Sequence, residues 1–211
     1  MKPDIARYFI AATAGVNLST VYHSNMPDAK DTTYDNIIGV FSDGAPRVNV
    51  HTGIYIAGFE AIIRNTTQAT AESYAQSIVN AVRSLHNRKT YYSLYLTAAM
   101  NNTSNPVSFS PDNGSGTSTS AAFATNDYIL IGSEILKVTG VVTTVVSASR
   151  AQLGTTIASH SDNDEVKNIT QSPIPGYKCD STFCDNGIES LGVDDKGRWE
   201  YSVRWTVRLK P

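Results

Sequence analysis

Charge is scarce in this chain of 211 residues. Asp, Glu, Lys and Arg together make up 17% of the sequence, and the formal net charge is −2. A global basic field that could hold a nucleic-acid backbone is therefore excluded. All apolar runs stay below the roughly 18 residues that indicate a membrane-spanning helix. The run from Tyr8 to Ala14 is too short for a signal peptide and follows Asp4, so we expect no membrane contact and a cytoplasmic setting.

Cysteine is equally scarce. Cys179 and Cys184 are the only two, too few for a framework of disulfides. Their CxxxxC spacing supplies at most half a zinc site, because no second pair and no histidine lies nearby in the sequence. Free thiols are the favoured interpretation, with a local disulfide and a metal site as the alternatives.

Catalytic signatures are missing as well. The sequence contains no GxSxG nucleophile elbow, no GxxxxGK[ST] phosphate-binding loop and no GxGxxG turn. The four histidines lie in unrelated contexts, and none belongs to an HxxxH, HExxH or HxH pattern. We therefore predict no catalytic, cofactor-binding or metal-binding residues, and a structural or binding role rather than an enzymatic one.

Small polar residues take the place of charge. Ser, Thr and Asn account for 59 of the 211 residues. Their side chains compete with helical hydrogen bonds, so their abundance favours strands and long polar loops. The apolar fraction of 41%, with 11 Tyr and 6 Phe, is still sufficient to build a sizeable core.

Two segments have the periodicity of amphipathic helices. Residues 4–14 follow Pro3, a residue favoured in the first turn of a helix, and place apolar side chains three or four positions apart. The second helix is expected from residue 69 to about residue 87, where an apolar stripe lies opposite a polar one. That stripe consists of Ala71, Tyr74, Ala75, Ile78, Val82 and Leu85.

Other segments alternate as strands do, among them Val16–Tyr22, Ile37–Phe41, His51–Asn65 and Thr90–Ala98. The turn residues 42–44 are expected to end the second of these, and the glycine at position 58 indicates a bulge or close packing in the third. The most regular alternation begins at Trp199. One face holds Trp199, Tyr201, Val203, Trp205, Val207 and Leu209, and the other holds Glu200, Ser202, Arg204, Thr206 and Arg208.

A change of composition after residue 100 indicates an insertion. Of the 26 residues from 101 to 126, 19 are Ser, Thr, Asn, Gly or Pro, which is typical of a linker or an exposed loop. Short strands are expected after it, at residues 127–131, 134–141, 143–147 and 165–169. We therefore predict an α+β domain over residues 1–100 and 173–211, in which a mostly antiparallel or mixed sheet packs with two helices. Residues 101–172 are expected to form the linker and an inserted small all-β module.

The C-terminal residues carry a resemblance to a known family. Residues 190–203 combine a Gly, an acidic pair, Gly-Arg, an aromatic residue and an alternating strand. This segment resembles the end of the tail terminator proteins of long-tailed bacteriophages, which are also catalogued as tail-completion or minor capsid proteins. The N-terminal helix, the strand ending near Asp43-Gly44, the strand reaching Arg64 and the amphipathic helix agree in order.

The resemblance, which covers about residues 1–100 and 173–211, implies a structural virion protein that caps the tail tube as a homo-oligomeric ring, commonly a hexamer. The ring stops polymerisation of the tail tube protein and joins the tail to a head-completion or connector protein. DNA passes through the lumen without sequence-specific binding. The implied location is the tail or neck of the virion, and the host cytoplasm during assembly.

Ring closure needs two different patches on each subunit. The candidate interaction residues, which could line such an interface or the lumen, are Arg64, Arg198, Trp199, Arg204 and Arg208. The alternative interpretation is that the arginines are simply the solvated face of a sheet.

The inserted part carries a second resemblance. Residues 131–138, residues 149–156 and His160 are similar to a small β module found in phage tail and fibre proteins. This similarity leaves open a function of another class, a fibre- or adhesin-like binding module that contacts host surface glycans through residues 101–172.

Overall fold

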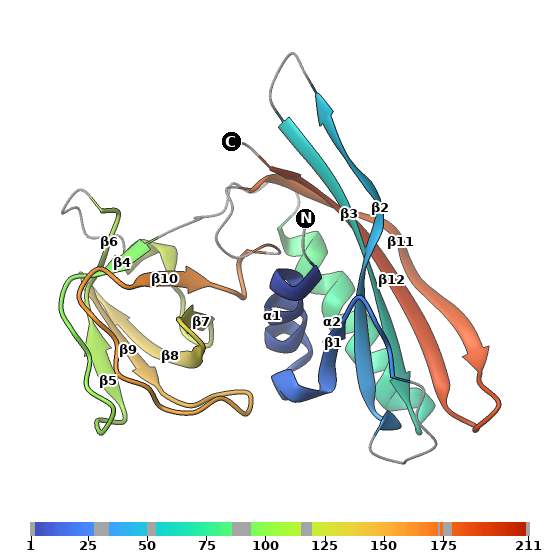
Figure 1. Ribbon diagram of the computed structural model, residues 1–211, viewed down its shortest axis with the longest axis horizontal. Helices are drawn as coiled ribbons and strands as arrows, with labels where there is room; N and C mark the ends of the chain where they lie inside the picture. Colours follow the sequence, from blue (N-terminus) through green and yellow to red (C-terminus); the bar gives the residue numbers. More distant parts are fainter. Residues whose placement is uncertain are drawn as a thin grey trace.

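The computed structural model describes residues 3–27, 34–49, 54–85, 94–114, 120–172, 174 and 179–209. Over these residues the chain forms two α-helices and two mostly antiparallel sheets (Figure 1), which confirms the predicted α+β class. The helices are α1 (Pro3–Ala14) and α2 (Gln68–Ser84). The strands are β1 (Val21–His23), β2 (Ile37–Asn49), β3 (Ile54–Asn65), β4 (Leu94–Leu96), β5 (Val107–Phe109), β6 (Pro111–Asp112), β7 (Tyr128–Ile131), β8 (Glu134–Val142), β9 (Val145–Ser149), β10 (Glu165–Asn168), β11 (Cys179–Val193) and β12 (Trp199–Leu209).

The first sheet holds five strands in the order β1-β2-β3-β12-β11. β1 pairs in parallel with β2, and the other neighbours are antiparallel, so the sheet is mixed. β12 comes from the end of the sequence, yet it lies beside β3, with Trp199 opposite Asn65 and Leu209 opposite Tyr55. Both helices pack on one face of this sheet (Figure 1). We call the opposite face the outer face.

α2 packs on the sheet through the predicted apolar stripe. Its buried residues are Ala71, Ala75, Ile78, Val79 and Val82, whose spacing places them on one side of the helix. Because a short helix is marginal by itself in water, this burial is what holds α2 in place. α1 ends before Gly15, whose φ of +68° is the left-handed conformation that commonly ends a helix.

The centre of the first core lies between β3 and β12. Trp205 is fully buried, and its ring stacks on the ring of Phe59 with the centroids 5.5 Å apart. The two residues lie directly opposite each other in the strand pair. Tyr201, Val203 and Leu209 on the same face are also buried, so the apolar side predicted for β12 is confirmed.

β2 is longer than predicted. The expected turn at residues 42–44 is wrong, because β2 continues to Asn49 with a register shift between Asp43 and Arg47. The prediction for Gly58 is confirmed: a Cβ atom there would lie 2.4 Å from the backbone oxygen of Asp43. The turn residues therefore deform a continuous strand instead of ending it, and the facing strand needs a glycine where the deformed backbone comes close.

The second sheet holds seven strands in the order β5-β9-β8-β7-β10-β4-β6, all antiparallel. It encloses a core of its own. β4 precedes residue 101 and was expected in the first part of the chain, but it pairs here with β10 and β6. The linker predicted for residues 101–126 is wrong in part, because β5 and β6 lie within it and pair with β9 and β4. Strands this short form only because neighbouring strands supply partners.

Two element boundaries also differ from the predictions. Val16–Tyr22, expected as a strand, contains a 3₁₀ turn at Leu18–Thr20 before β1 begins. The strand expected at residues 143–147 is β9, which begins two residues later. Residues 51–53 and 86–93, on which parts of three predictions fall, lie outside the described residues.

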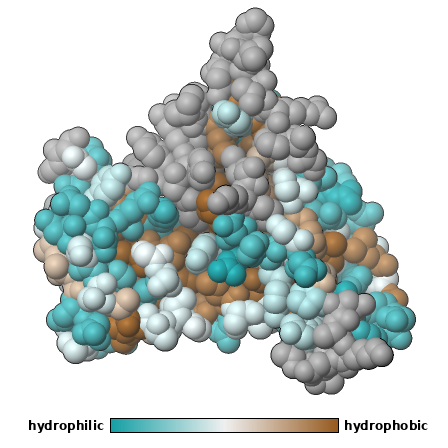
Figure 2. All heavy atoms as spheres, viewed as in Figure 1, coloured by the Kyte–Doolittle hydropathy of each residue, from teal (hydrophilic) through white to brown (hydrophobic). Residues whose placement is uncertain are grey.

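α1 joins the two sheets. Its residue Ala12 shares a buried cluster with Leu130 and Ile135 of the second sheet and with Ile169. A backbone hydrogen bond from Leu18 N to Leu153 O, 2.9 Å long, crosses the same junction. Hydrophobic surface is visible at the middle of the molecule, where α1 lies (Figure 2). The second sheet is therefore packed against the first part of the chain through an apolar contact, and is more than a tethered module.

Candidate interaction surface

The outer face is lined by the side chains that alternate with the first core. On β3 and β12 these include Ile56, Glu60, Ile62, Arg204, Thr206 and Arg208, which are half-buried or exposed. At one corner Pro27 approaches the face, since Arg64 Nη1 donates to Pro27 O at 3.1 Å. Over β12 and β11 no other described element covers this face (Figure 1), and hydrophobic surface is visible over these two strands (Figure 2).

Arg204 and Glu60 form an ion pair at the centre of the outer face. Arg204 Nε and Nη2 lie 3.1 and 3.0 Å from Glu60 Oε1, and the Ser202 hydroxyl donates to the same oxygen at 2.5 Å. These hydrogen bonds and the charge of Glu60 raise the pKa of Arg204, and the charges of Glu189 and Asp43 add to the effect. The arginine is therefore always charged, and its charge is balanced within the face.

Carboxylates outnumber arginines around this pair. Asp43, Asp185 and Glu189 are exposed, and the Thr206 hydroxyl donates to Asp185 Oδ2 at 2.8 Å. Arg208 is exposed further along β12, with its guanidinium 5.2 Å from the centroid of the Phe183 ring. A face with this balance of charge does not attract a nucleic-acid backbone.

Arg64 and Arg198 lie in a buried ionic network at the end of the same strands. Arg198 is 2% exposed, and its Nε and Nη2 lie 2.7 and 2.6 Å from Asp194 Oδ2. Arg64 is 9% exposed and donates to Glu200 Oε1 at 2.8 Å, with Asp194 Oδ2 at 3.8 Å. Two of the predicted interaction residues, Arg64 and Arg198, are therefore buried. Their carboxylate partners come from the turn between β11 and β12 and from β12 itself.

Asp194 organises the turn between β11 and β12. Its Oδ1 accepts hydrogen bonds from the backbone N–H groups of Lys196 and Arg198, each at 2.9 Å. Partial burial would raise the pKa of Asp194, but the hydrogen bonds and the charge of Arg198 outweigh it and lower the pKa to about 2. The Asp-Asp-Lys-Gly-Arg segment therefore has a structural role in closing this hairpin.

The five predicted interaction residues do not form one site. Arg64 and Arg198 share the buried network, and Arg204 and Arg208 lie on the outer face. Trp199 is half-buried and packs against the first core. Sequence reasoning missed the partner of Arg204, Glu60, although both residues fall in the outward-facing set of their strands. The pairing of β3 with β12 is what joins them, and alternation alone does not reveal which strands are neighbours.

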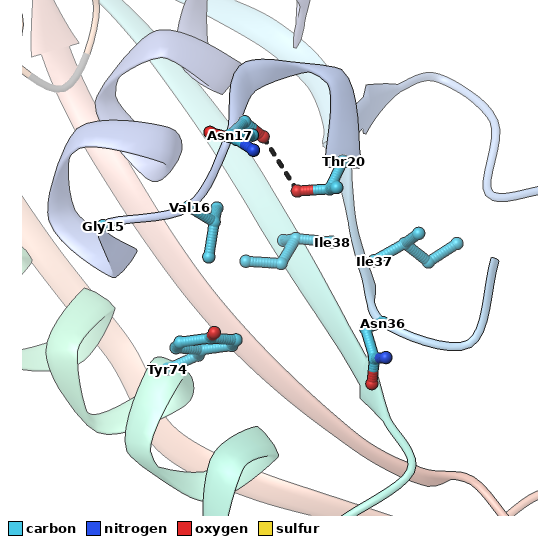
Figure 3. A pocket seen from close by; sticks show the side chains of 8 residues that line it. All are labelled: Gly15, Val16, Asn17, Thr20, Asn36, Ile37, Ile38 and Tyr74. Carbon is cyan, nitrogen blue, oxygen red and sulfur yellow. Dashed lines mark hydrogen bonds between the residues drawn. The ribbon is translucent and has the colours of Figure 1, made fainter. Parts of the chain in front are cut away.

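A pocket opens where α1, β2 and α2 meet (Figure 3). It has a volume of about 280 Å³ and is lined by Gly15, Val16, Asn17, Thr20, Asn36, Ile37, Ile38 and Tyr74. Val16 and Ile38 point into it, and Tyr74 lies across from Asn17 and Thr20 with one face of its ring turned toward them. The Thr20 hydroxyl donates to Asn17 O at 2.8 Å. We call this hollow the Tyr74 pocket.

The second sheet contains a buried ionic cluster of its own. Glu134 accepts from Arg150 Nε at 2.9 Å and from Arg150 Nη2 at 2.5 Å, and His160 Nε2 lies 2.8 Å from Glu134 Oε2. Burial would raise the pKa of Glu134, but the hydrogen bonds from Arg150, His160 and two backbone N–H groups hold it below its usual value. Arg150 also donates to the backbone oxygens of Asn101 and Ala158. The cluster therefore joins the loops that contain Asn101 and Ala158 to the second sheet.

No disulfide joins Cys179 and Cys184 in the structure. Within the described ranges, no three His, Cys, Asp or Glu side chains are placed so that they could hold a metal ion. Nor does any described helix combine the length and apolar character needed to span a membrane. Comparison with known proteins finds no match for this chain among protein-family models or among curated proteins.

Proposed function

We propose that the protein is a structural virion protein that caps the end of a phage tail tube as an oligomeric ring, stops polymerisation of the tube and joins the tail to the head or neck. One observation carries the proposal: the first sheet ends in two different edges on opposite sides, β1 and β11. A closed ring built from one kind of contact needs two different surfaces on each subunit.

The two edges differ in length and direction. β1 is a three-residue strand parallel to its neighbour, whereas β11 has fifteen residues and three register shifts against β12. Edge strands carry backbone groups without a partner in the sheet, and they pair with other chains unless something prevents it. Near the end of β11, Leu191 and Val193 are 46% and 49% exposed. Apolar side chains at an open edge favour burial against another protein.

The family resemblance of residues 190–203 supports the same function and supplies the partners: the tail tube protein on one side of the ring and a head-completion or connector protein on the other. A hexamer in the tail or neck of the virion, assembled in the host cytoplasm, is part of the proposal. DNA would pass through the lumen of the ring without sequence-specific binding. The acidic balance around Arg204 and Glu60 on the outer face agrees with that part of the proposal.

Mass photometry and negative-stain electron microscopy of the purified protein test the ring, alone and with tail tube protein. Rings on tube ends, and tubes that stop growing when the protein is added, are the expected result. Monomers alone in both conditions, with tubes growing on unchanged, would overturn the proposal.

A pair of variants locates the contact. We expect Leu191→Lys with Val193→Lys to abolish ring formation, because both side chains are exposed beside the β11 edge. Val142→Lys is the matched control, since Val142 is 72% exposed but lies in the second sheet. Loss of the ring in the control to the same degree would show that the β11 edge is not the contact.

A fibre- or adhesin-like contact with host surface glycans through residues 101–172 is the second candidate. The observation in its favour is an apolar hairpin tip between β8 and β9, where Val142 and Val145 are 72% and 38% exposed. Deleting the second sheet is a poor test because the deletion uncovers the apolar side of α1. Val142→Ser with Val145→Ser is better: lost host adsorption with normal tails favours this candidate, and normal adsorption counts against it.

A further inference from the structure

We propose that the Tyr74 pocket binds a small neutral ligand with several hydroxyl groups, of the size and chemistry of a single sugar ring. The proposal does not depend on the capping function. The pocket lies on the helix-covered side of β2 and draws its residues from the segment after α1, the start of β2 and α2. It is therefore separate from the outer face and from the β11 edge.

The volume of the pocket limits the ligand. At about 280 Å³, it lies at the small end of ligand pockets, which range from about 300 to 1,000 Å³. A single ring with its substituents fills such a space, whereas a nucleotide or an extended cofactor exceeds it.

The lining limits the charge of the ligand. The eight lining residues are Gly, Val, Asn, Thr, Ile and Tyr types, and none of them carries a charge at neutral pH. A phosphate, a carboxylate or an ammonium group would lose part of its hydration there and find no opposite charge, which is unfavourable. The pocket therefore selects a neutral ligand.

Hydrogen-bonding groups on the rim remain available to a ligand. The Asn17 carboxamide and the Tyr74 hydroxyl make no hydrogen bond with any described residue, and the Thr20 hydroxyl, which donates to Asn17 O, can still accept. Asn36 uses its Oδ1 to accept from Thr66 N at 3.2 Å, which leaves its NH2 group free to donate. Polar groups of Asn17, Thr20 and Tyr74, from the segment after α1 and from α2, thus lie around one small volume.

The floor of the pocket is apolar. Ile38 is 2% exposed, and Val16 and the ring of Tyr74 complete this side. A fully apolar ligand would cover the polar rim and leave its groups without partners, which is costly. A sugar ring suits both the polar rim and the apolar floor, because its hydroxyl edge bonds to the rim while its C–H face packs on Ile38, Val16 and the ring of Tyr74.

Heteronuclear NMR of the isotope-labelled protein tests the proposal, with methyl glucoside and N-acetylglucosamine as neutral probes and glucuronate and glucose 6-phosphate as charged ones. Saturable shifts of the backbone signals of Val16, Asn17, Ile38 and Tyr74 with a neutral probe, and weaker shifts with the charged ones, are the expected result. Absence of saturable shifts with both neutral sugars overturns the proposal, as does equal binding of the charged sugars.

Three variants confirm the location. Asn17→Ala with Tyr74→Phe removes hydrogen-bonding groups without touching the core, and we expect binding to weaken about tenfold, as for the loss of one or two hydrogen bonds. Val16→Phe fills the pocket and is expected to abolish binding. Asn80→Ala with Tyr95→Phe makes the same types of change elsewhere and is expected to leave binding unchanged. Binding that survives both pocket variants, or that falls equally in the control, assigns the ligand to another place and rejects the proposal.

Discussion

Arg150 and Glu134 form a bidentate salt bridge in which both side chains are 0% exposed. Arg150 Nε donates to one carboxylate oxygen and Nη2 to the other. Moving two charges out of water is costly, so such a pair holds the structure together only while both partners are present. The pair therefore fixes the loops that cross the edge of the second sheet, and it makes that sheet sensitive to the loss of either charge.

Glu134→Gln tests this dependence. We expect a loss of roughly 3–5 kcal/mol in the free energy of unfolding, because the variant leaves the Arg150 guanidinium buried without a counter-charge. Urea unfolding followed by circular dichroism measures the change. The double variant Glu134→Leu with Arg150→Met is expected to lose less than Glu134→Gln alone. A double variant that is clearly less stable than the single one contradicts the argument.

Gly58→Ala tests the close approach of β2 and β3. The added Cβ would lie 2.4 Å from Asp43 O, a backbone atom that moves only if β2 moves. We expect a loss of about 1–3 kcal/mol, the usual range for overpacking. Gly140→Ala is the matched control in the second sheet, because a Cβ there meets no atom within 4 Å. Equal thermal stability of the two variants would contradict the assignment of a steric role to Gly58.

The sequence was sufficient to predict both helices, the apolar face of β12 and the close packing at Gly58. Each of these depends on a local pattern: a helical stripe, strict alternation or one glycine in a strand. β4 falls within the strand predicted at Thr90–Ala98, but its pairing in the second sheet was not predicted. β5 and β6 escaped prediction because strands of two or three residues have no usable periodicity and exist only through their partners. The extension of β2 beyond Phe41 escaped because turn residues also occur in bulges.

The candidate surface was less predictable than the fold. The alternation of β12 correctly placed Arg204 and Arg208 away from the core, but it carries no information about the carboxylates on neighbouring strands. The partner of Arg198 lies only four residues away, at Asp194, and that spacing within a turn was a usable signal for an internal ion pair. The partner of Arg204, by contrast, is Glu60, which is 144 residues distant in sequence.

Trp205 offers a test of the first core. Its indole Nε1 is buried and has no hydrogen-bond partner among the described residues, so the ring contributes through packing alone. Trp205→Ala is expected to lose about 3–5 kcal/mol, and Trp205→Phe much less, because the smaller ring keeps its contact with Phe59 and removes an unsatisfied N–H group. Thermal unfolding measures both. A Phe variant as unstable as the Ala variant would contradict the argument that packing of an aromatic ring on Phe59 supplies most of the contribution.

The low pKa of Asp194 predicts how the stability of the protein depends on pH. Its pKa of about 2 in the folded protein lies below the value of about 3.9 of an unfolded chain. The folded state therefore favours the ionised carboxylate. Its stabilising contribution is complete above about pH 4 and is lost as the pH falls toward 2. The contribution is at most about 2 kcal/mol, because water screens part of the interaction near the surface.

Asp194→Asn removes this contribution, so the variant should be less stable than the natural protein at pH 6 and should approach it in stability near pH 2. Urea unfolding at intervals between pH 2 and pH 6 measures the difference. Asp195→Asn is the matched control, since Asp195 is the next residue in the chain and its side chain is exposed. It is expected to change the free energy of unfolding by less than about 0.5 kcal/mol. A difference between Asp194→Asn and the natural protein that stays constant over the whole range would refute the role of the Asp194 charge, because only a contribution tied to ionisation disappears when the carboxylate is protonated.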